Sequence, residues 1–256
     1  MHQNLRFCFL ILLLCLPLNA CTSSKDRSND YFDVQKYNAY TAQQARKKNF
    51  STIRTDMALK GLTLGAPVFI RAFKTEMELE VWVKRTYRDG YRLYKTYPIC
   101  QKSGELGPKL AEGDLQTPEG FYNVTYDRLN PNSKYHLALN IGYPNTYDRD
   151  HGRTGSALMI HGSCVSEGCL AMTDQNIEDI YIIAEESLKH GQREVPVHLF
   201  PFRMTDENML ARNTNPWTPF WYNLKQGYDY FETYHIPPKI SVMNQQYAFN
   251  AGAAYY

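Results

Sequence analysis

The chain has 256 residues, and its 28 basic and 26 acidic side chains leave a formal net charge of only +2. Proteins that bind nucleic acid rely on clustered lysine and arginine, whereas the one basic run here, residues 46–48, is typical of a solvated helix face. These numbers argue against nucleic acid as the main partner. The 20 tyrosines and 12 phenylalanines suit a β-rich fold with flat sugar- or peptide-binding surfaces, and core packing explains most of them equally well.

The first 20 residues have the pattern of an export signal. Arg6 supplies the positive charge, and residues 7–16 form an apolar stretch that is too short to span a membrane as a helix. Residues 18–21 resemble a lipobox, in which Cys21 would be acylated. The alternative is ordinary cleavage after Ala20, which leaves an unmodified cysteine. We expect a signal peptide over 1–20 and a membrane-anchored lipoprotein in the periplasm of a Gram-negative bacterium, because the several acyl chains of such an anchor make the attachment long-lived.

A tether and a helix are expected over residues 21–61. Residues 22–35 are polar and have few apolar side chains to offset the entropy of ordering, so they indicate a flexible tether. From residue 36 to about 60 the mixed pattern of apolar and polar residues predicts a helix.

Beyond Gly65 the apolar residues alternate with a period of two, which is typical of β-strands. Asp89-Gly90 has the composition of a hairpin turn. The pattern therefore predicts an antiparallel meander. Its three apolar runs are Val68, Ile70 and Phe73, then Leu79, Val81 and Val83, then Tyr91, Leu93 and Tyr97.

A glycine-rich segment follows, and it ends in Gly113-Asp114-Leu115-Gln116-Thr117-Pro118-Glu119-Gly120. It has no Gly-Lys-Ser/Thr element, so it is not a phosphate-binding loop. A plain turn is one interpretation, because Pro118 fixes φ and Gly120 permits a positive φ.

Strands and helices are predicted in the remainder of the chain. Thr173 is placed to cap a helix over 174–190, and Gly191 would end it. Beyond residue 201 the sequence becomes aromatic and helical, which predicts an appendage packed on the core or a lid. The additional strands are predicted over residues 121–126, 136–141, 157–160 and 195–200.

Three cysteines remain after the signal and Cys21 are set aside: Cys100, Cys164 and Cys169. Spare thiols tend to pair in the oxidising envelope of a bacterium. The simplest arrangement is a Cys100–Cys164 disulfide with Cys169 free, and the alternative is three free thiols.

The run of residues 160–169 carries the chemistry. His161 lies eight positions before Cys169, and an imidazole near a cysteine is the usual means of generating the reactive thiolate. Amides around Gly168 and Cys169 are candidates for an oxyanion hole, together with the loop residues Gly162 and Ser166. Cys164 is closer to His161 along the chain, but no glycine precedes it.

His161-Gly162 followed by Ser166-Glu167-Gly168-Cys169 resembles the signature of the L,D-transpeptidase (YkuD-type) catalytic domain. The resemblance implies that Cys169 is the nucleophile and His161 the base, and that the substrates are peptidoglycan stem peptides. In that family an element similar to Gly113-Asp114-x-x-Thr117-Pro118-x-Gly120 frames the active-site cleft. The resemblance implies no cofactor and no metal.

Two positions depart from the cross-linking members of the family, which usually carry a histidine at the position of Glu167 and arginine or asparagine at that of Ala171. These departures resemble the YafK-type subgroup of Gram-negative bacteria, as do Gly107-Pro108-Lys109 and residues 201–206 and 227–231. Its best-understood member is an amidase that detaches a lipoprotein from diaminopimelate in peptidoglycan.

The resemblance implies an α+β, mainly β fold, with a YkuD-type sandwich or barrel-like core over 62–201, a helix after the catalytic cysteine, and a helical, aromatic-rich appendage over 202–256. A thioester on Cys169 would form at diaminopimelate. Water as its acceptor would make the protein an amidase that releases peptidoglycan-linked lipoprotein. An amine acceptor would make it a transpeptidase that forms 3–3 cross-links or attaches lipoprotein. A non-catalytic peptidoglycan-binding lipoprotein is the third hypothesis.

Overall fold

The computed structural model describes residues 27–85 and 90–250, with side chains from 41 onward and without that of the last residue. The signal peptide, Cys21 and Asp89 of the expected hairpin turn lie outside these residues. The helices are α1 (Arg27–Leu59), α2 (Thr146–Asp150), α3 (Asp174–Lys189), α4 (Asp206–Leu210) and α5 (Thr218–Tyr234), with a 3₁₀ turn at Tyr126–Arg128. The strands are β1 (Val68–Phe73), β2 (Glu78–Lys84), β3 (Tyr91–Pro98), β4 (Gln101–Lys102), β5 (Gly120–Val124), β6 (Leu129–Asn130), β7 (Ala138–Asn140), β8 (Met159–His161), β9 (Leu170–Ala171), β10 (Val195–Phe200), β11 (Lys239–Met243) and β12 (Gln246–Asn250).

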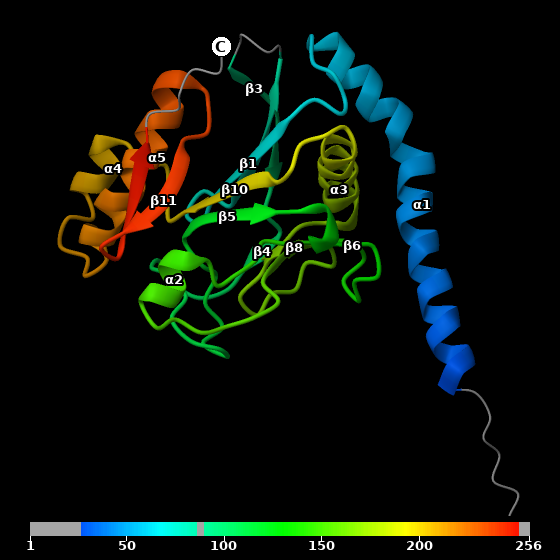
Figure 1. Ribbon diagram of the computed structural model, residues 1–256, viewed down its shortest axis with the longest axis horizontal. Coiled ribbons are helices and arrows are strands. Elements are labelled where there is room, and N and C mark those ends of the chain that lie inside the picture. The colour runs from blue at the N-terminus through cyan, green and yellow to red at the C-terminus, as the bar shows by residue number, and fades with distance from the viewer. Residues whose placement is uncertain (1–26, 86–89, 251–256) are drawn as a thin grey trace, which may run out of the picture.

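The first sheet has the strand order β3-β2-β1-β10-β5 (Figure 1). The predicted meander is confirmed, because β1 pairs with β2 and β2 with β3, both antiparallel. β10 lies beside β1 and runs parallel to it, with Ile70 opposite Val197. Both β1 and β10 are buried along almost their whole length. This explains why each strand is mostly apolar and does not alternate regularly between apolar and polar residues.

The second sheet carries the residues singled out by the motif. Its order is β4-β9-β8-β7-β6, and only β8 and β9 are parallel to each other. One hydrophobic core joins this sheet to the first sheet and to the helices α1 and α3. Leu139 and Ile160 belong to this core from the second sheet, and Ile70, Ile183 and Met57 from the other elements.

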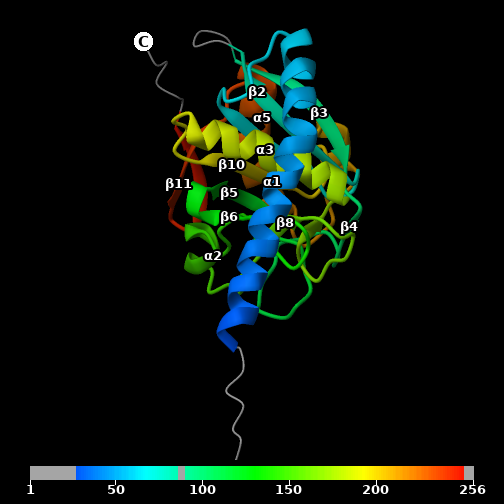
Figure 2. The ribbon, with the colours of Figure 1, turned by 90° about the vertical axis from the view of Figure 1, so that its right-hand side faces the viewer.

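Helix α3 confirms the helix predicted after the cysteine. The Thr173 side chain accepts a hydrogen bond from the Asn176 amide at its start, and Gly191 follows its end with φ of 103°. The long helix α1 packs on α3 and crosses it at a steep angle (Figure 2). Arg46 of α1 pairs with Glu186 of α3 at 2.7 Å. Helix α1 begins at Arg27, within the run expected to be a tether, and no described helix has the length and apolar character needed to cross a membrane.

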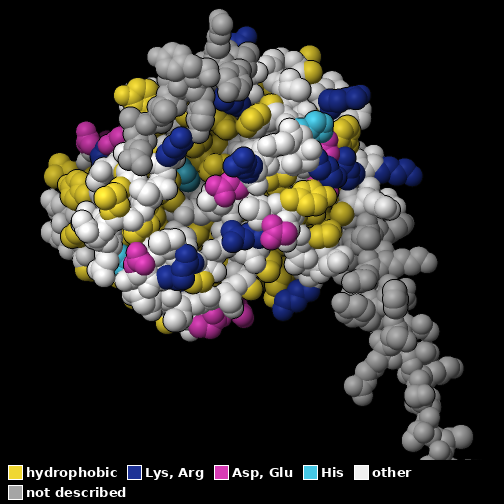
Figure 3. Space-filling view, viewed as in Figure 1, with side chains coloured by type: hydrophobic (Ala, Val, Ile, Leu, Met, Phe, Trp, Pro, Cys, Tyr) yellow, Lys and Arg dark blue, Asp and Glu magenta, His cyan; other side chains and the backbone are white. Residues whose placement is uncertain are grey.

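The C-terminal appendage packs on the first sheet, on the side away from α1 (Figure 1). A second, aromatic core joins Phe73 and Phe200 of the sheet to Trp221 and Tyr228 of α5. The appendage also contains the hairpin β11–β12, which was not predicted. On the face seen in Figure 3, basic and acidic side chains are interspersed, and apolar side chains gather over the appendage. The α+β fold class with a helical aromatic appendage is thereby confirmed.

Candidate active site

The parallel pairing of β8 and β9 brings His161 and Cys169 to one place. His161 is the last residue of β8, and Cys169 immediately precedes β9. His161 lies opposite Ala171 in the pairing, and neighbouring strands are about 4.8 Å apart. Both side chains line one cavity of about 440 Å³. The two residues that the motif predicts to act together therefore share a cleft.

The tautomer of His161 is determined by its backbone partner. Its Nδ1 lies 2.6 Å from the carbonyl oxygen of Gly162, and a carbonyl only accepts, so Nδ1 carries the proton. The lone pair is then on Nε2, which can accept a proton. Burial lowers the pKa of His161, and the bond to Gly162 opposes this only in part. The Tyr135 ring stacks on the imidazole with centroids 4.7 Å apart.

Cys169 is the free cysteine among the described residues, and it is half-buried. Burial raises the pKa of its thiol, while a hydrogen bond from the Met159 backbone and the positive charge of Lys109 act in the opposite direction. Its Sγ lies 3.9 Å from the carbonyl oxygen of Ala157, which suits an S–H donor. Both shifts favour the neutral forms, a thiol at Cys169 and an unprotonated imidazole at His161.

Two hydroxyl groups hold the backbone of Cys169. Ser166 Oγ donates to the Cys169 carbonyl oxygen at 2.7 Å, and Thr117 Oγ1 donates to the same oxygen at 3.3 Å. Ser103 Oγ lies 3.3 Å from Ser166 Oγ and accepts the Gly168 amide at 2.5 Å. The turn before Cys169 is thus bonded to segments far away in the sequence.

Two of the amides expected to contribute to an oxyanion hole are donated to other groups of the protein. The Gly168 amide is already donated to Ser103 Oγ, and the Gly162 amide is donated to the carbonyl oxygens of Tyr135 and Leu137 at 3.0 and 3.3 Å. Because each N–H group has one proton, these bonds occupy both donors. Position 162 has room only for glycine, because a Cβ there would lie 2.5 Å from Asp174 Oδ1.

The segment expected to frame the cleft is organised by Asp114. Its carboxylate accepts hydrogen bonds from the amides of Leu110, Ala111 and Gln116 at 2.8–3.0 Å, and it pairs with Lys109. Burial alone would raise the pKa of Asp114, but these bonds outweigh it and lower the pKa to about 2. Gly113, with φ of 76°, supplies the adjoining turn. Gly113, Asp114, Thr117, Pro118 and Gly120 lie outside the lining of the 440 Å³ cavity, and this segment reaches the site through the hydrogen bond of Thr117 to the Cys169 carbonyl.

A buried ion pair ties that segment to the appendage. Lys74 Nζ lies 3.0 Å from Glu119 Oε1, and Lys74 also donates to the carbonyl oxygens of Gly107 and Thr117 at 2.9 Å. The other oxygen of Glu119 accepts Trp221 Nε1 of α5 at 2.8 Å. Burial lowers the pKa of Lys74, and Glu119 opposes this shift. The appendage is thus connected by hydrogen bonds, through Thr117, to the Cys169 carbonyl.

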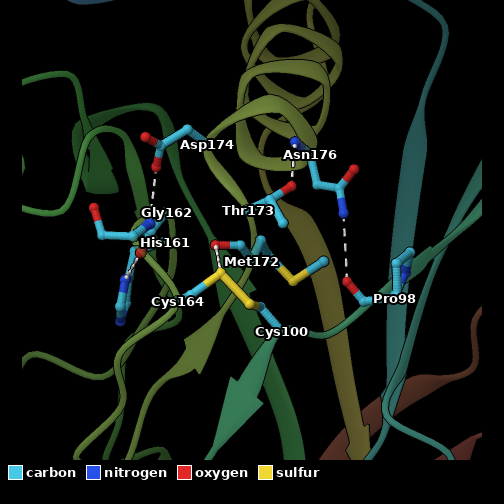
Figure 4. The surroundings of a disulfide bond; sticks show 10 residues. Pro98, Cys100, His161, Gly162, Cys164, Met172, Thr173, Asp174 and Asn176 are labelled. Atoms are coloured by element: carbon cyan, nitrogen blue, oxygen red, sulfur yellow. Dashed lines mark hydrogen bonds between the residues drawn. A yellow bond between two sulfur atoms is a disulfide. The ribbon is translucent and has the colours of Figure 1, made fainter.

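The structure contains the Cys100–Cys164 disulfide, with a Cα–Cα distance of 5.3 Å (Figure 4). This is the first of the two arrangements considered for the three cysteines. The bond joins the residue before β4 to the loop between His161 and Cys169. The same loop is held by the Ser163 amide, which donates to Asp174 at the start of α3 at 2.8 Å.

The motif did not single out several of the cleft's side chains. Tyr135 and Lys134 come from the β6–β7 loop and Gln101 from β4, and they line the cavity with Met159 and Glu167. Gln101, Lys134 and Tyr135 are distant in sequence from the motif, so no local pattern identifies them. Within the described ranges, no group of three or more His, Cys, Asp and Glu residues is placed to hold a metal ion.

A family model describing the L,D-transpeptidase catalytic domain, YkuD, matches residues 68–198. The chain is also 47% identical over 197 residues to the proteins named "Putative L,D-transpeptidase YafK" in Escherichia coli K12 and O157:H7, covering 77% of this chain and 79% of theirs. The chain belongs to the L,D-transpeptidase (YkuD) family.

Solved structures give weaker likenesses. A mutant of the helical cell shape determining protein Pgp2 from Campylobacter jejuni is 23% identical, with a TM-score of 0.43, and the match covers 66% of this chain and 62% of that one. Bd1075 from Bdellovibrio bacteriovorus is 16% identical, with a TM-score of 0.38, over 74% of this chain and 90% of that one.

As an L,D-transpeptidase family member, the chain is a peptidoglycan enzyme that resembles YafK, and its substrates are stem peptides. Its two departures from the cross-linking pattern occupy different environments. Glu167 is exposed and lines the cleft, whereas Ala171 is fully buried opposite His161. The residue two positions after the cysteine therefore adds no polar group to the cleft.

Proposed function

We propose that this L,D-transpeptidase family member is an amidase that releases lipoprotein from peptidoglycan by cleaving its bond to diaminopimelate. The observation that carries the catalytic part is the shared cavity of Cys169 and His161, in which Nε2 of His161 is the basic nitrogen. Reactive cysteines commonly depend on such a base. The similarity to YafK supports the choice of substrate.

The reaction begins with proton transfer from Cys169 to Nε2 of His161. The thiolate then attacks the carbonyl carbon of diaminopimelate that is joined to the lysine amine of the lipoprotein. When the tetrahedral intermediate collapses, the C–N bond breaks, and the leaving amine takes the proton from the imidazolium. A thioester remains on Cys169, and the lipoprotein leaves with a free lysine amine.

Hydrolysis completes the cycle. His161, neutral again, takes a proton from water, the hydroxide adds to the thioester carbonyl, and the thiolate leaves and is reprotonated. The buried Ala171 favours this outcome, since cross-linking members usually carry a polar arginine or asparagine at that position, and an acceptor stem peptide finds no such group here. Water needs no binding group of its own.

The experiment compares the products released from lipoprotein-bearing sacculi. The intact protein is expected to release lipoprotein, either with a free terminal lysine or, after other bonds in the wall are cut, with one diaminopimelate attached. Muropeptide profiles of the same digest should show no gain in 3–3 cross-links. Cys169→Ala is the control, because it removes the nucleophile and leaves the disulfide intact.

New 3–3 cross-links without released lipoprotein would identify a cross-linking transpeptidase and overturn the proposal. Release by Cys169→Ala would show that another group performs the reaction. Unchanged sacculi with the intact protein, together with binding to them, would support the non-catalytic hypothesis instead.

The proposal includes export and a lipid anchor at Cys21, which place the enzyme at a membrane surface in the periplasm. The motif of residues 18–21 supports this anchor. Cys21→Ala should move the protein from the membrane fraction to the soluble periplasmic fraction. An unchanged distribution would contradict lipidation of Cys21.

A further inference from the structure

Two side chains of opposite charge line the cleft without a charged partner. Lys134 lies on the β6–β7 loop and Glu167 on the β8–β9 loop, and both are exposed to the cavity of Cys169. Across the described part of the chain, neither of them forms an ion pair. Other charges near the site are already paired, as in Lys109 with Asp114.

The two charges lie on different loops of the same cavity. Lys134 Nζ lies 4.9 Å from the centroid of the Tyr135 ring, and that ring stacks on His161. Glu167 is two residues before Cys169, close enough for its negative charge to act on the thiol. The cavity that holds Cys169 and His161 therefore carries one cation, on the loop of Tyr135, and one anion, on the loop of Cys169.

An exposed lysine or glutamate is usually only solvated and contributes little. Here the two unpaired charges are the charged groups of the cavity lining, and that cavity must hold the acyl donor. A ligand with both an ammonium and a carboxylate satisfies both of them, whereas a ligand with one charge leaves the other unpaired.

Diaminopimelate has such a structure. When one of its carboxyl groups is the carbonyl under attack, the other end of the molecule carries a free ammonium and a free carboxylate on one carbon. Resting on the proposed function, we propose that the cleft recognises this zwitterionic end, with Lys134 binding the carboxylate and Glu167 binding the ammonium.

The test pairs changes in the protein with changes in the substrate. The substrates are synthetic stem peptides with diaminopimelate linked to lysine, in three forms: unmodified, with the distal carboxylate amidated, and with the distal amine acetylated. The proteins are the intact chain, Lys134→Met and Glu167→Gln. Lys47→Met on α1 and Glu207→Gln on α4 are matched controls, because they remove the same charges from exposed positions outside the cavity lining.

For the intact chain, each substrate modification should lower kcat/KM about 10- to 100-fold, the range for a hydrogen bond to a charged group. Lys134→Met should lose a similar factor on the unmodified substrate and no longer distinguish the amidated form, while it still discriminates against the acetylated form. Glu167→Gln should show the reverse pattern. Both control variants should behave as the intact chain does.

Equal losses on all three substrates for either variant would overturn the recognition of this zwitterion, and so would unchanged discrimination. These outcomes are separable from failure of the proposed function. If the products are cross-links rather than released amine, the proposed amidase is wrong, but the same pattern of acyl-donor discrimination would still support the recognition by Lys134 and Glu167.

Discussion

Removing the disulfide should destabilise the protein while leaving the nucleophile acylatable. The bond joins cysteines 64 positions apart, and in the chain-entropy model a loop of this length contributes about 4 kcal/mol to the free energy of unfolding. The double variant Cys100→Ser with Cys164→Ser should therefore unfold at a urea midpoint lower by more than about 1 M, for a slope of roughly 2–3 kcal/mol/M. Cys169 should still be acylated, because the loop retains the bonds of Ser163 to Asp174 and of Gly168 to Ser103.

The intact chain under reducing conditions is the control for this variant. It should unfold at the same urea concentration as the double variant, since both lack the same cross-link. A difference in unfolding free energy below about 1 kcal/mol between the oxidised intact chain and the double variant would refute the reasoning. A native double variant that cannot be acylated would show that the bond also fixes the catalytic loop.

Three further predictions concern the neighbouring groups. Glu119→Gln should lower the free energy of unfolding by about 3–5 kcal/mol in the same urea assay, because it leaves the Lys74 ammonium buried without its partner. Adding Lys74→Met should recover part of this loss. A Glu119→Gln variant as stable as the intact chain would contradict the prediction. Alkylation of Cys169 by iodoacetamide should accelerate up to and beyond pH 9, because the pKa of the thiol is raised. Turnover should fall only below pH 6.5, where His161 becomes protonated. Rapid alkylation at pH 5 would indicate a thiolate–imidazolium pair instead. Thr117→Val should reduce kcat about fivefold with little change in KM, because it removes a hydrogen bond of roughly 1 kcal/mol to the Cys169 carbonyl. A change in KM alone would assign Thr117 to substrate binding.

Strongly periodic segments could be predicted from the sequence, and weakly patterned ones could not. The meander β1–β3 follows from alternating apolar residues, and α3 follows from its cap at Thr173 and its stop at Gly191. The hairpin β11–β12 does alternate, with Ile240 and Val242 on one strand and Tyr247 and Phe249 on the other, but these runs are short and no glycine marks the turn between them. Asn244 and Gln245 instead adopt φ of 50° and 60°, and glutamine is an unusual residue for this conformation. Strands β4, β6 and β9 have two residues each, which is too short for any period to be visible.

The shared cleft of His161 and Cys169 could be predicted because both residues belong to one short motif. Its supporting groups could not, since Ser103 reaches the Gly168 amide from 65 positions away. The same bond uses the Gly168 amide, one of the donors expected at an oxyanion hole, to fix the turn, and a role for the Cys169 amide stays a prediction. Tyr135 stacks on His161 only because β7 pairs with β8, and this pairing is not encoded near either residue.

The measurement that tests the account most directly is the site of acylation. A carbapenem has a strained ring carbonyl that a thiolate opens to form a thioester, and peptide mass spectrometry then locates the adduct. The adduct is expected on the peptide that contains Cys169, and none is expected on the Cys169→Ala protein. An adduct on the peptides of Cys100 or Cys164, or undiminished labelling of Cys169→Ala, would contradict Cys169 as the nucleophile.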